Sequence, residues 1–408
     1  MSDNAKANVV SARIDATLEA MSPFLRFFQD SAWSGRDPKH QDNCDFVFGN
    51  PHEMPLPEFV SSLQRNLPPQ DQDWYAYKVN EPESRRTIAE SLRERRGLPF
   101  EPQDVFVTNG AFAALSVSIC TLIDPGDEII FISPPWFFYE SIIVNYGGNP
   151  VRVKIDDSTL DLDLEAIAAA ITKRTRAIIV NSPNNPTGKI FPPETLQALA
   201  NLLTEASERN GSPIYLLSDE AYSRIIFDDL EYPSPTSYYP NSLLIYTYGK
   251  TLLTPGQRIG YIALPPTMPS RAKLRNALLA AQLVTGFAFP NALLQHSLAE
   301  LETLSIDIPK LQRKRDRLTD ELGAMGYEVK PPEGTFYLLV RSPLHDDLAF
   351  CEALAAQKVY VLPGTVFEMP GFFRISLTAN DEMVERSLPG FAAALKRTPS
   401  TIATPAEA

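Results

Sequence analysis

Short apolar runs alternate with helical segments through the middle of this 408-residue chain, and this alternation constrains the fold more than any other feature. Apolar runs of four to eight residues favour buried strands, whereas longer periodic segments favour helices. The expected strands are residues 104–108, 128–132, 151–153, 176–180, 214–218 and 242–246. The expected helices between them are residues 111–122, 138–146, 164–171 and 193–210. Such a chain is expected to form an α/β fold, with a mostly parallel sheet that helices cover on both faces.

The pattern changes after about residue 290. A charged helical region continues to Met325 with an interruption near Pro309, and three later segments, 335–340, 359–362 and 372–377, are typical of strands. A chain of this length favours two domains over one simple core. We expect an N-terminal arm with part of a small domain at 1–47, a large domain at 48–289, a small α+β domain at 290–397 and a disordered tail at 398–408.

Composition excludes several classes of protein. The net charge of -13 argues against unspecific binding of nucleic acid or of an anionic membrane, because both need clustered cations. Three widely spaced cysteines and four scattered histidines make neither a disulfide framework nor a metal motif. The chain shows no signal-peptide pattern and no run of about 18 apolar residues, so we expect a cytoplasmic protein without a membrane span.

Polar or small residues follow four of the expected strands. In chain order they are Gly110, Asn185, Asp219 and Lys250. Ligands of open α/β sheets bind outside the carboxyl ends of the strands. We therefore expect these four residues to belong to one site.

The residue types at these positions suit pyridoxal phosphate (PLP). Lys250, in Tyr-Gly-Lys-Thr, would form the imine, and its amine would then move the α-proton of the substrate. Asp219 would keep the pyridine nitrogen protonated through a charge-assisted hydrogen bond. Taken alone, Lys250 could be an ordinary surface lysine and Asp219 an ordinary helix N-cap. Their combination favours the cofactor.

Further residues match the other parts of the cofactor. Tyr222 and Asn185 would hydrogen-bond the ring oxygen, and Trp136 would stack on the ring. Tyr139, one turn after Trp136, would support Asp219. The alternatives are an ordinary turn for Asn-Pro-Thr-Gly and core packing for Trp136.

The phosphate would bind where a helix begins. Gly110 and Ala111 open the helix after the strand 104–108, and backbone N–H groups at a helix N-terminus attract anions. Thr247 would add a hydroxyl group and Arg258 a guanidinium. Arg374, in the apolar segment 372–377, would bind the α-carboxylate of the substrate through two parallel hydrogen bonds, or else form a buried structural ion pair.

With these residues the chain resembles the class I/II aminotransferases, PLP enzymes of fold type I that include aspartate aminotransferase, over roughly residues 46–388. The motifs Asn-Pro-Thr-Gly and Asp-x-x-Tyr, the lysine and the carboxy-terminal arginine occur in the family order. The resemblance implies a seven-stranded sheet in a PLP-binding large domain, and a homodimer that shares its active sites. It also implies that Tyr75 reaches the cofactor phosphate of the neighbouring subunit and that Gly49 lies near the substrate carboxylate.

The chain departs from the family pattern in three places. Residues 246–249 replace the usual serine-rich run before the lysine, and Asn80 replaces a glycine that follows the Tyr75 position. Phe112 stands where some aspartate-using relatives have a lysine that binds the side-chain carboxylate. Together with Phe137 and Phe138, Phe112 favours an apolar or aromatic substrate over aspartate.

The resulting hypothesis is an aminotransferase that moves the amino group of an amino acid to a 2-oxo acid, by ping-pong chemistry through a Lys250 Schiff base. The motifs equally suit another PLP reaction on the same fold: β- or γ-elimination or replacement, decarboxylation, or a biosynthetic condensation. A non-catalytic PLP-sensing module is disfavoured, because no basic helix-turn-helix segment precedes residue 46. The amino donor, the acceptor and the pathway remain open.

Overall fold

The computed structural model describes residues 9–397 of the chain. The tail expected at 398–408 and the first residues of the expected arm lie outside the described residues. The chain divides into two compact units, which are described separately. The first comprises Met54–Ile308, Glu333–Thr335 and the described part of Met1–Ser22; the second comprises Pro23–Glu53, Pro309–Pro332 and the described part of Phe336–Ala408.

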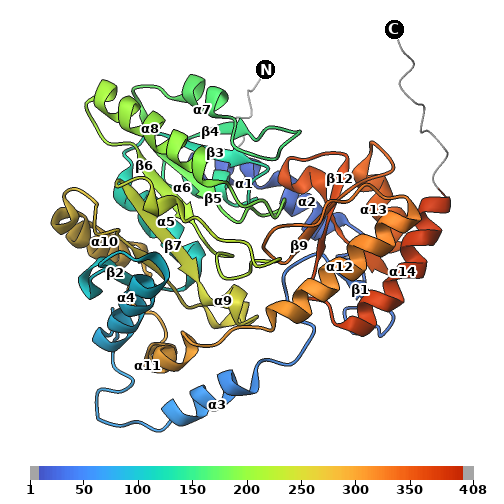
Figure 1. The fold of residues 1–408 in the computed structure, drawn as a ribbon, viewed down its shortest axis with the longest axis horizontal. Helices are drawn as coiled ribbons and strands as arrows, with labels where there is room; N and C mark the ends of the chain where they lie inside the picture. The colour runs from blue at the N-terminus through green and yellow to red at the C-terminus, as the bar shows by residue number, and fades with distance from the viewer. Residues whose placement is uncertain (1–8, 398–408) are drawn as a thin grey trace, which may run out of the picture. The chain divides into compact units, whose positions relative to one another are not determined.

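A seven-stranded sheet forms the centre of the first unit (Figure 1). Its strands lie in the order β2 (Val105–Thr108), β8 (Gly260–Ala263), β7 (Ser242–Thr247), β6 (Tyr215–Asp219), β5 (Thr175–Asn181), β3 (Glu128–Ser133) and β4 (Asn149–Lys154). Neighbouring strands are parallel except at β8, which is antiparallel to both β2 and β7. The predicted α/β fold with a mostly parallel seven-stranded sheet is confirmed. All six expected strands are present, and β8 is the seventh.

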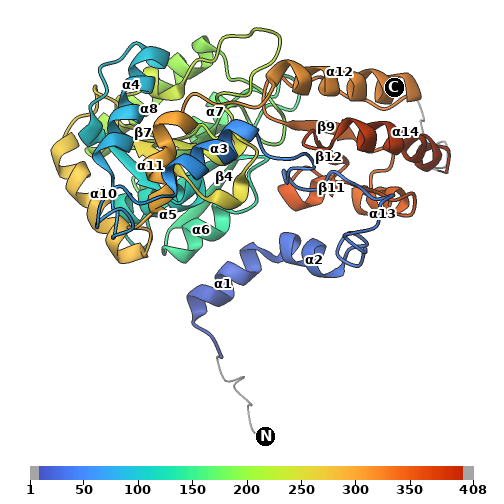
Figure 2. The same ribbon diagram turned by 90° about the horizontal axis from the view of Figure 1, so that it is seen from below.

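Helices cover both faces of this sheet (Figure 2). One face carries α5 (Gly110–Leu122), α6 (Tyr139–Asn145) and α10 (Arg271–Thr285), and the other carries α4 (Pro82–Arg96), α7 (Leu164–Ala170), α8 (Pro193–Asn210) and α11 (Ala292–Leu301). Side chains alternate along β3: Ile129 packs in the core on the α5 face, and Ile130 packs under α7 and α8. A strand buried on both faces must be apolar throughout, which is why the short apolar runs located these strands.

Local signals set the helix ends. Pro193 lies in the first turn of α8. A backbone N–H at that position has no carbonyl partner within the helix, so its absence in proline costs no hydrogen bond. Gly97 ends α4 with φ +65°, a left-handed conformation that glycine adopts without strain. The unit also contains α1 (Ala12–Ala20), α3 (Pro57–Asn66) and the one-turn helix α9 (Tyr248–Thr251).

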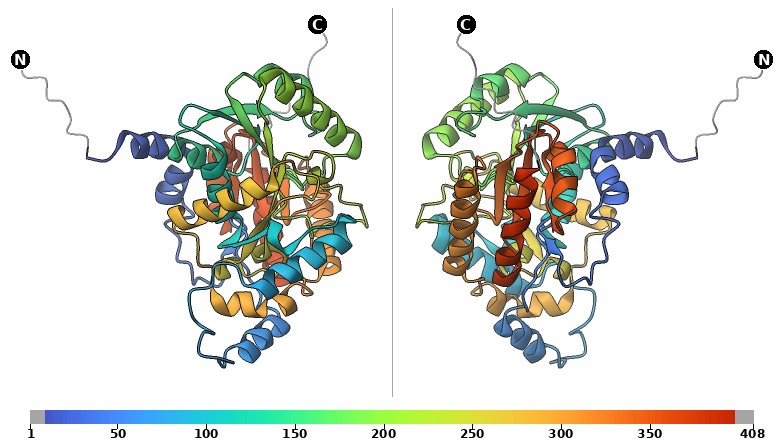
Figure 3. Two further views of the ribbon diagram at one scale, coloured as in Figure 1. Left: turned by 90° about the vertical axis from the view of Figure 1, so that its left-hand side faces the viewer. Right: turned by 90° about the vertical axis from the view of Figure 1, so that its right-hand side faces the viewer.

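The second unit is smaller and of mixed α and β structure. An antiparallel sheet has the order β11 (Leu362–Pro363), β12 (Phe372–Ser376) and β9 (Tyr337–Arg341), and β1 (Cys44–Asp45) pairs with β10 (Val359–Tyr360). The helices are α12 (Ile308–Met325), α13 (Asp347–Ala355), α14 (Asp381–Lys396) and α2 (Ser22–Asp30), of which α12, α13 and α14 face the viewer on the right of Figure 3.

The break in the long helical region lies earlier than expected. The sequence predicted an interruption near Pro309, but residues 302–307 separate α11 from α12, and Pro309 is the second residue of α12. The N–H groups in the first turn of a helix have no carbonyl partner within that helix. A proline there therefore costs no helical hydrogen bond. Pro309 therefore begins the helix and does not interrupt it.

Candidate active site

A cavity of about 300 Å³ lies in the first unit, where β5, β6 and β7 end. Of the residues predicted from the sequence, it is lined by Ala111, Trp136, Asn185, Asp219, Tyr222, Thr247, Lys250 and Arg258. These residues come from five separate segments of the chain. The sheet topology brings them together, because the parallel strands end at the same edge.

Lys250 lies in the one-turn helix α9, directly after β7. Thr247 caps this helix, since its Oγ1 accepts a hydrogen bond from the N–H of Gly249 at 3.4 Å. The Lys250 amine is 5.5 Å from the centre of the Tyr222 ring. The turn therefore places a partly buried amine in the cavity, with an aromatic side chain beside it.

Asp219 is the last residue of β6, and 5% of it is exposed. Its Oδ2 accepts a hydrogen bond from Tyr139 Oη at 2.5 Å, and its Oδ1 accepts one from the N–H of Ala221 at 3.2 Å. Burial raises the pKa of Asp219, while these two hydrogen bonds and the positive charge of Lys250 act in the opposite direction. Burial and the Asp219 charge raise the pKa of Tyr139 far above its ordinary value, so its hydroxyl remains a donor.

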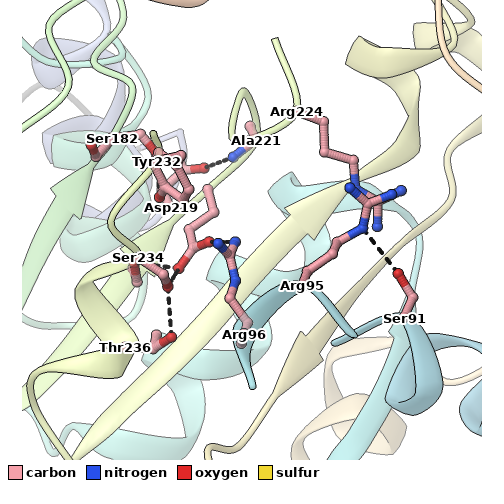
Figure 4. A network of polar contacts seen from close by, with 12 residues as sticks. Ser91, Arg95, Arg96, Ser182, Asp219, Ala221, Arg224, Tyr232, Ser234 and Thr236 are labelled. Carbon is pink, nitrogen blue, oxygen red and sulfur yellow. Dashed lines mark hydrogen bonds and ion pairs between the residues drawn. The ribbon is translucent and has the colours of Figure 1, made fainter. Parts of the chain in front are cut away.

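A second carboxylate stands directly beside Asp219. Glu220 is fully buried, and its Oε2 lies 2.6 Å from Nη2 of Arg96 on α4. Ser218 and Ser234 donate hydrogen bonds to the other oxygen, and Figure 4 shows Arg96, Ser234 and Thr236 grouped below Asp219. The buried carboxylate of Glu220 is therefore paired with a cation, next to two residues that line the cavity.

The Asn-Pro-Thr-Gly turn is tied to the sheet by Asn181, the last residue of β5. Asn181 donates a hydrogen bond to the carbonyl of Asp219 at 2.9 Å and accepts one from the N–H of Asn185 at 2.7 Å. Asn181 also lines the cavity. The sequence analysis missed this residue, although a polar residue that ends an apolar strand was the signal that identified Asp219.

The start of α5 has the features of an anion site. Gly110 has φ +80°, and a Cβ there would lie 2.9 Å from Nη2 of Arg258. Arg258 donates one hydrogen bond to the carbonyl of Pro255 at 2.9 Å, and burial lowers the pKa of its guanidinium. A helix N-terminus and a guanidinium group thus meet at a residue without a side chain.

Aromatic side chains form one wall of the cavity. The Trp136 ring meets the Phe112 ring edge to face, with 5.0 Å between the centres, and meets the Tyr139 ring in the same way at 5.6 Å. Phe112 also contacts Phe138 and remains 37% exposed. Leu115 extends this apolar surface.

Arg374 and Gly49 belong to the second unit, and the fold brings them close together there. Arg374 is 2% exposed on β12, donates a hydrogen bond to the carbonyl of Val47 at 3.1 Å and lies 3.8 Å from the centre of the Tyr337 ring. A Cβ at Gly49 would lie 2.9 Å from Tyr337 Oη. The arginine and the glycine loop therefore both border the Tyr337 side chain.

Tyr75 does not line the cavity of the single chain. It is 52% exposed, and its hydroxyl group donates a hydrogen bond to the carbonyl of Leu67. Its suggested role depends on a neighbouring subunit, so that role remains a prediction.

The cavity fits PLP in each of its parts. The cradle at Gly110 and Arg258 suits a phosphate, and a Cβ would fill it. The cavity also contains a buried carboxylate (Asp219), an amine (Lys250) and an indole (Trp136), which suit a ring partner, an imine-forming group and a stacking surface. In residues 9–397, no three His, Cys, Asp or Glu side chains gather as a metal ion would require, and no helix is long and apolar enough to span a membrane.

Comparison with known proteins shows the family of the chain. The sequence model of the family described as "Aminotransferase class I and II" matches residues 45–389. The aspartate/prephenate aminotransferase of Thermus thermophilus is 33% identical over 355 residues, which cover 85% of this chain and 89% of the relative. An aminotransferase structure from Eubacterium rectale superposes with a TM-score of 0.83 at 31% identity, covering 95% of this chain and 96% of that one. For the aspartate aminotransferase of Thermotoga maritima the TM-score is 0.79 at 28% identity, covering 95% and 100%.

The chain therefore belongs to the class I and II aminotransferase family. It is a PLP-dependent transferase that moves an amino group from an amino acid to a 2-oxo acid. The predicted family, cofactor and reaction are confirmed. Transamination is thus favoured over elimination, decarboxylation or condensation on the same fold.

Proposed function

We propose that Lys250 holds the cofactor covalently and then moves the proton at the α-carbon of the substrate. The observation that carries this assignment is the convergence of Lys250, Asp219 and Arg258 on one cavity. Bound PLP supplies an electron sink for the substrate's α-carbon. The two substrates react in turn, so the oxo acid formed from the donor leaves before the acceptor binds.

The other residues bind and tune the cofactor. Asp219 holds a proton at the pyridine nitrogen, and Tyr222 and Asn185 donate hydrogen bonds to the ring oxygen. Trp136 stacks on the ring. These roles are supported by the positions of the four side chains around the cavity.

The phosphate and the substrate carboxylate bind to cations and backbone N–H groups. Gly110 and Ala111 at the start of α5 bind the phosphate together with Thr247 and Arg258, while Arg374 binds the α-carboxylate beside Gly49. Support comes from the cradle at Gly110 and from the buried guanidinium of Arg374.

The test of this proposal is Lys250→Ala. Because proton transfer by a positioned group contributes about 10²- to 10⁴-fold, we expect turnover to fall by at least about 10²-fold. The matched control is Lys189→Ala, which removes a lysine of the same unit whose amine pairs with Glu333 at 2.9 Å. Turnover that survives Lys250→Ala, or that falls equally with Lys189→Ala, contradicts the assignment.

We also propose that the substrate side chain is apolar or aromatic. The relatives from Thermus are named for aspartate and prephenate, but the side-chain wall beside Lys250 consists of Phe112, Leu115 and Trp136. An aromatic wall favours a ring or an aliphatic chain, because a carboxylate packed against Phe112 or Leu115 would lose water without gaining a charged partner from either side chain.

Phe112→Lys tests this substrate class. We expect kcat/KM for phenylalanine or leucine to fall and that for aspartate to rise, because the new ammonium group can pair with the side-chain carboxylate. Competition between single amino acid donors measures the ratio directly. A wild-type enzyme that already prefers aspartate over phenylalanine would overturn the proposal.

The oligomeric state, the location and the domain limits also belong to the proposal. A homodimer is supported by apolar side chains on the surface of the first unit, where the Tyr77 ring lies 4.9 Å from the Phe289 ring and Tyr77 is 86% exposed. A cytoplasmic location is supported by the three free cysteines. The predicted limits of 48–289 for the cofactor-binding domain and 290–397 for the small domain differ from the compact units, which place 48–53 in the second unit and 290–308 in the first. Limited proteolysis would test which limits hold.

A further inference from the structure

A buried charged cluster joins the segment after β6 to the end of α11. At its centre, Nη2 of Arg224 lies 2.5 Å from Oε1 of Glu302, and the two side chains are only 8% and 7% exposed. Arg224 Nη1 also donates a hydrogen bond to the main-chain carbonyl of Glu302 at 3.4 Å. Both charges are therefore removed from water, and the loss of either partner would leave the other unfavourably buried.

The same cluster holds the one-turn helix of Lys250. Tyr248, two residues before Lys250, donates a hydrogen bond to Oε2 of Glu302. Thr251, the residue after Lys250, has its Oγ1 2.6 Å from the hydroxyl group of Tyr246. Lys250 is thus flanked on both sides by side chains that the cluster fixes.

Arg224 packs against the tyrosine rings as well as against the carboxylate. Its guanidinium carbon lies 4.4 Å from the centre of the Tyr246 ring and 5.5 Å from that of Tyr248, so cation–π attraction adds to the ion pair. Ser91 of α4 donates a further hydrogen bond to Glu302, and Arg95 lies 4.0 Å from the same oxygen. Figure 4 shows Arg224 and Arg95 with Ser91 beside them.

We propose that Arg224 and Glu302 are positioning residues, which fix the distance between Tyr222 and Lys250 in the cavity. Arg224 is two residues from Tyr222, and Glu302 binds Tyr248, two residues from Lys250. Neither Arg224 nor Glu302 is among the residues that line the cavity. They act through the two backbone segments, and the inference rests on the proposed role of Lys250.

Stability alone does not explain such a pair. Apolar side chains of similar volume often stabilise a fold as well as a buried ion pair does. The Glu302 carboxylate accepts directional hydrogen bonds from Arg224, Tyr248 and Ser91, which fix geometry in a way that apolar contacts do not. A displacement of about 1 Å between reacting groups can cost about 10²-fold in rate.

The test replaces both charges at once with Arg224→Met and Glu302→Leu, so that no unpaired charge remains buried. We expect a folded protein that still binds PLP. Its kcat should be about 10- to 100-fold lower with KM little changed, because the geometry of the reacting groups is lost and the binding groups are kept. The pH midpoint at which the visible absorption of the bound cofactor changes should also move, because that midpoint reports the surroundings of the Lys250 nitrogen.

The matched control is Glu128→Leu with Arg174→Met. This pair also has a buried carboxylate, 6% exposed and 2.6 Å from its arginine, but it lies at the start of β3, away from the cavity. We expect kcat and the pH midpoint of the control to equal those of the wild type. If the first double variant does not fold, Glu302→Gln keeps the side-chain shape and should still move the midpoint.

Two outcomes would overturn the inference: a normal kcat and midpoint in the Arg224/Glu302 variant, or equal changes in the control. Failure of the proposed function is a separate result. It would be seen as turnover in Lys250→Ala, whatever the variants of the cluster do.

Discussion

The contact that most affects the chemistry at the scale of single residues is the hydrogen bond from Tyr139 to Asp219. In the proposed mechanism, Asp219 must stay ionised to hold a proton at the pyridine nitrogen, yet its burial favours the neutral acid. Tyr139 counters this effect from 2.5 Å. Its hydroxyl group remains a donor because burial raises its own pKa far above neutral pH.

We predict that Tyr139→Phe moves the acid limb of the kcat/KM profile to higher pH by about one to two units, since a hydrogen bond to a charged group is worth about 1.5–3 kcal/mol. The sign follows because the Tyr139 hydrogen bond lowers the pKa of Asp219, so its removal raises that pKa. Activity that needs the ionised carboxylate is then lost earlier on acidification. Tyr146→Phe, just past the end of the same helix, should leave the profile in place. An unmoved limb in Tyr139→Phe would contradict the role given to this tyrosine.

The sequence located residues of the cavity where a polar side chain ends or follows an apolar strand. Lys250, Asp219 and Asn185 were found in this way, and all three line the cavity. Glu302 was missed because nothing near it in sequence identifies it; its partner Arg224 lies 78 positions away. Whether two charged residues form a buried ion pair depends on which segments the fold brings together. The periodicity of apolar residues in the sequence does not show which segments meet.

At the scale of helices and strands, the start of α5 shows how one helix contributes to an anion-binding site. A thirteen-residue helix presents its first N–H groups, and Gly110 leaves the space that Arg258 borders. Any Cβ at this position would meet the guanidinium and would also strain a backbone with φ +80°.

We predict that Gly110→Ala weakens PLP binding about tenfold, because an L residue in the left-handed region costs about 1–2 kcal/mol and the methyl group intrudes on the cradle. Gly126→Ala is the control, since Gly126 has φ +91° but no atom within 4 Å of its would-be Cβ. Fluorescence titration of the apoenzyme with PLP measures both constants. Equal losses in the two variants would show that backbone strain, and not the cradle, is responsible.

The elements recovered from the sequence are those with continuous apolar runs. Six strands of the large sheet and the helix α8 lie where the pattern predicted them. The strand β8 was missed because it has four residues, begins with Gly260 and follows the loop of Arg258 without a helix between them. An antiparallel strand inside a parallel sheet breaks the alternation on which the prediction depended.

The exposed apolar side chains bear on the oligomeric state, at the scale of the whole molecule. On α10, Leu283 is 52% and Val284 79% exposed, and Tyr77 with Phe289 adds aromatic surface in the same unit. Apolar patches of this kind mark interaction sites. The proposed role of Tyr75 requires a second copy of the chain, and we expect that copy to cover these apolar side chains.

We predict a dimer in light scattering that Val284→Glu weakens, because the carboxylate would be buried without a partner. Leu348→Glu, an exposed leucine of the second unit, should leave the mass unchanged. A monomeric wild-type protein at micromolar concentration would contradict the dimer.

Shared sites make a further prediction. Mixing Lys250→Ala with Tyr75→Phe should restore up to about a quarter of the wild-type sites, because each mixed dimer then contains one site with both native residues. Activity no greater than that of the separate variants would show that Tyr75 acts within its own subunit, or not at all.

The most direct test of the central claim is to locate the cofactor on the chain. The purified enzyme would be loaded with PLP, reduced with borohydride, digested and mapped by mass spectrometry. We predict that the reduced cofactor is attached to Lys250 and that the label is lost in Lys250→Ala. A label on any other lysine, or none after loading with PLP, would contradict the assignment of this cavity as the active site.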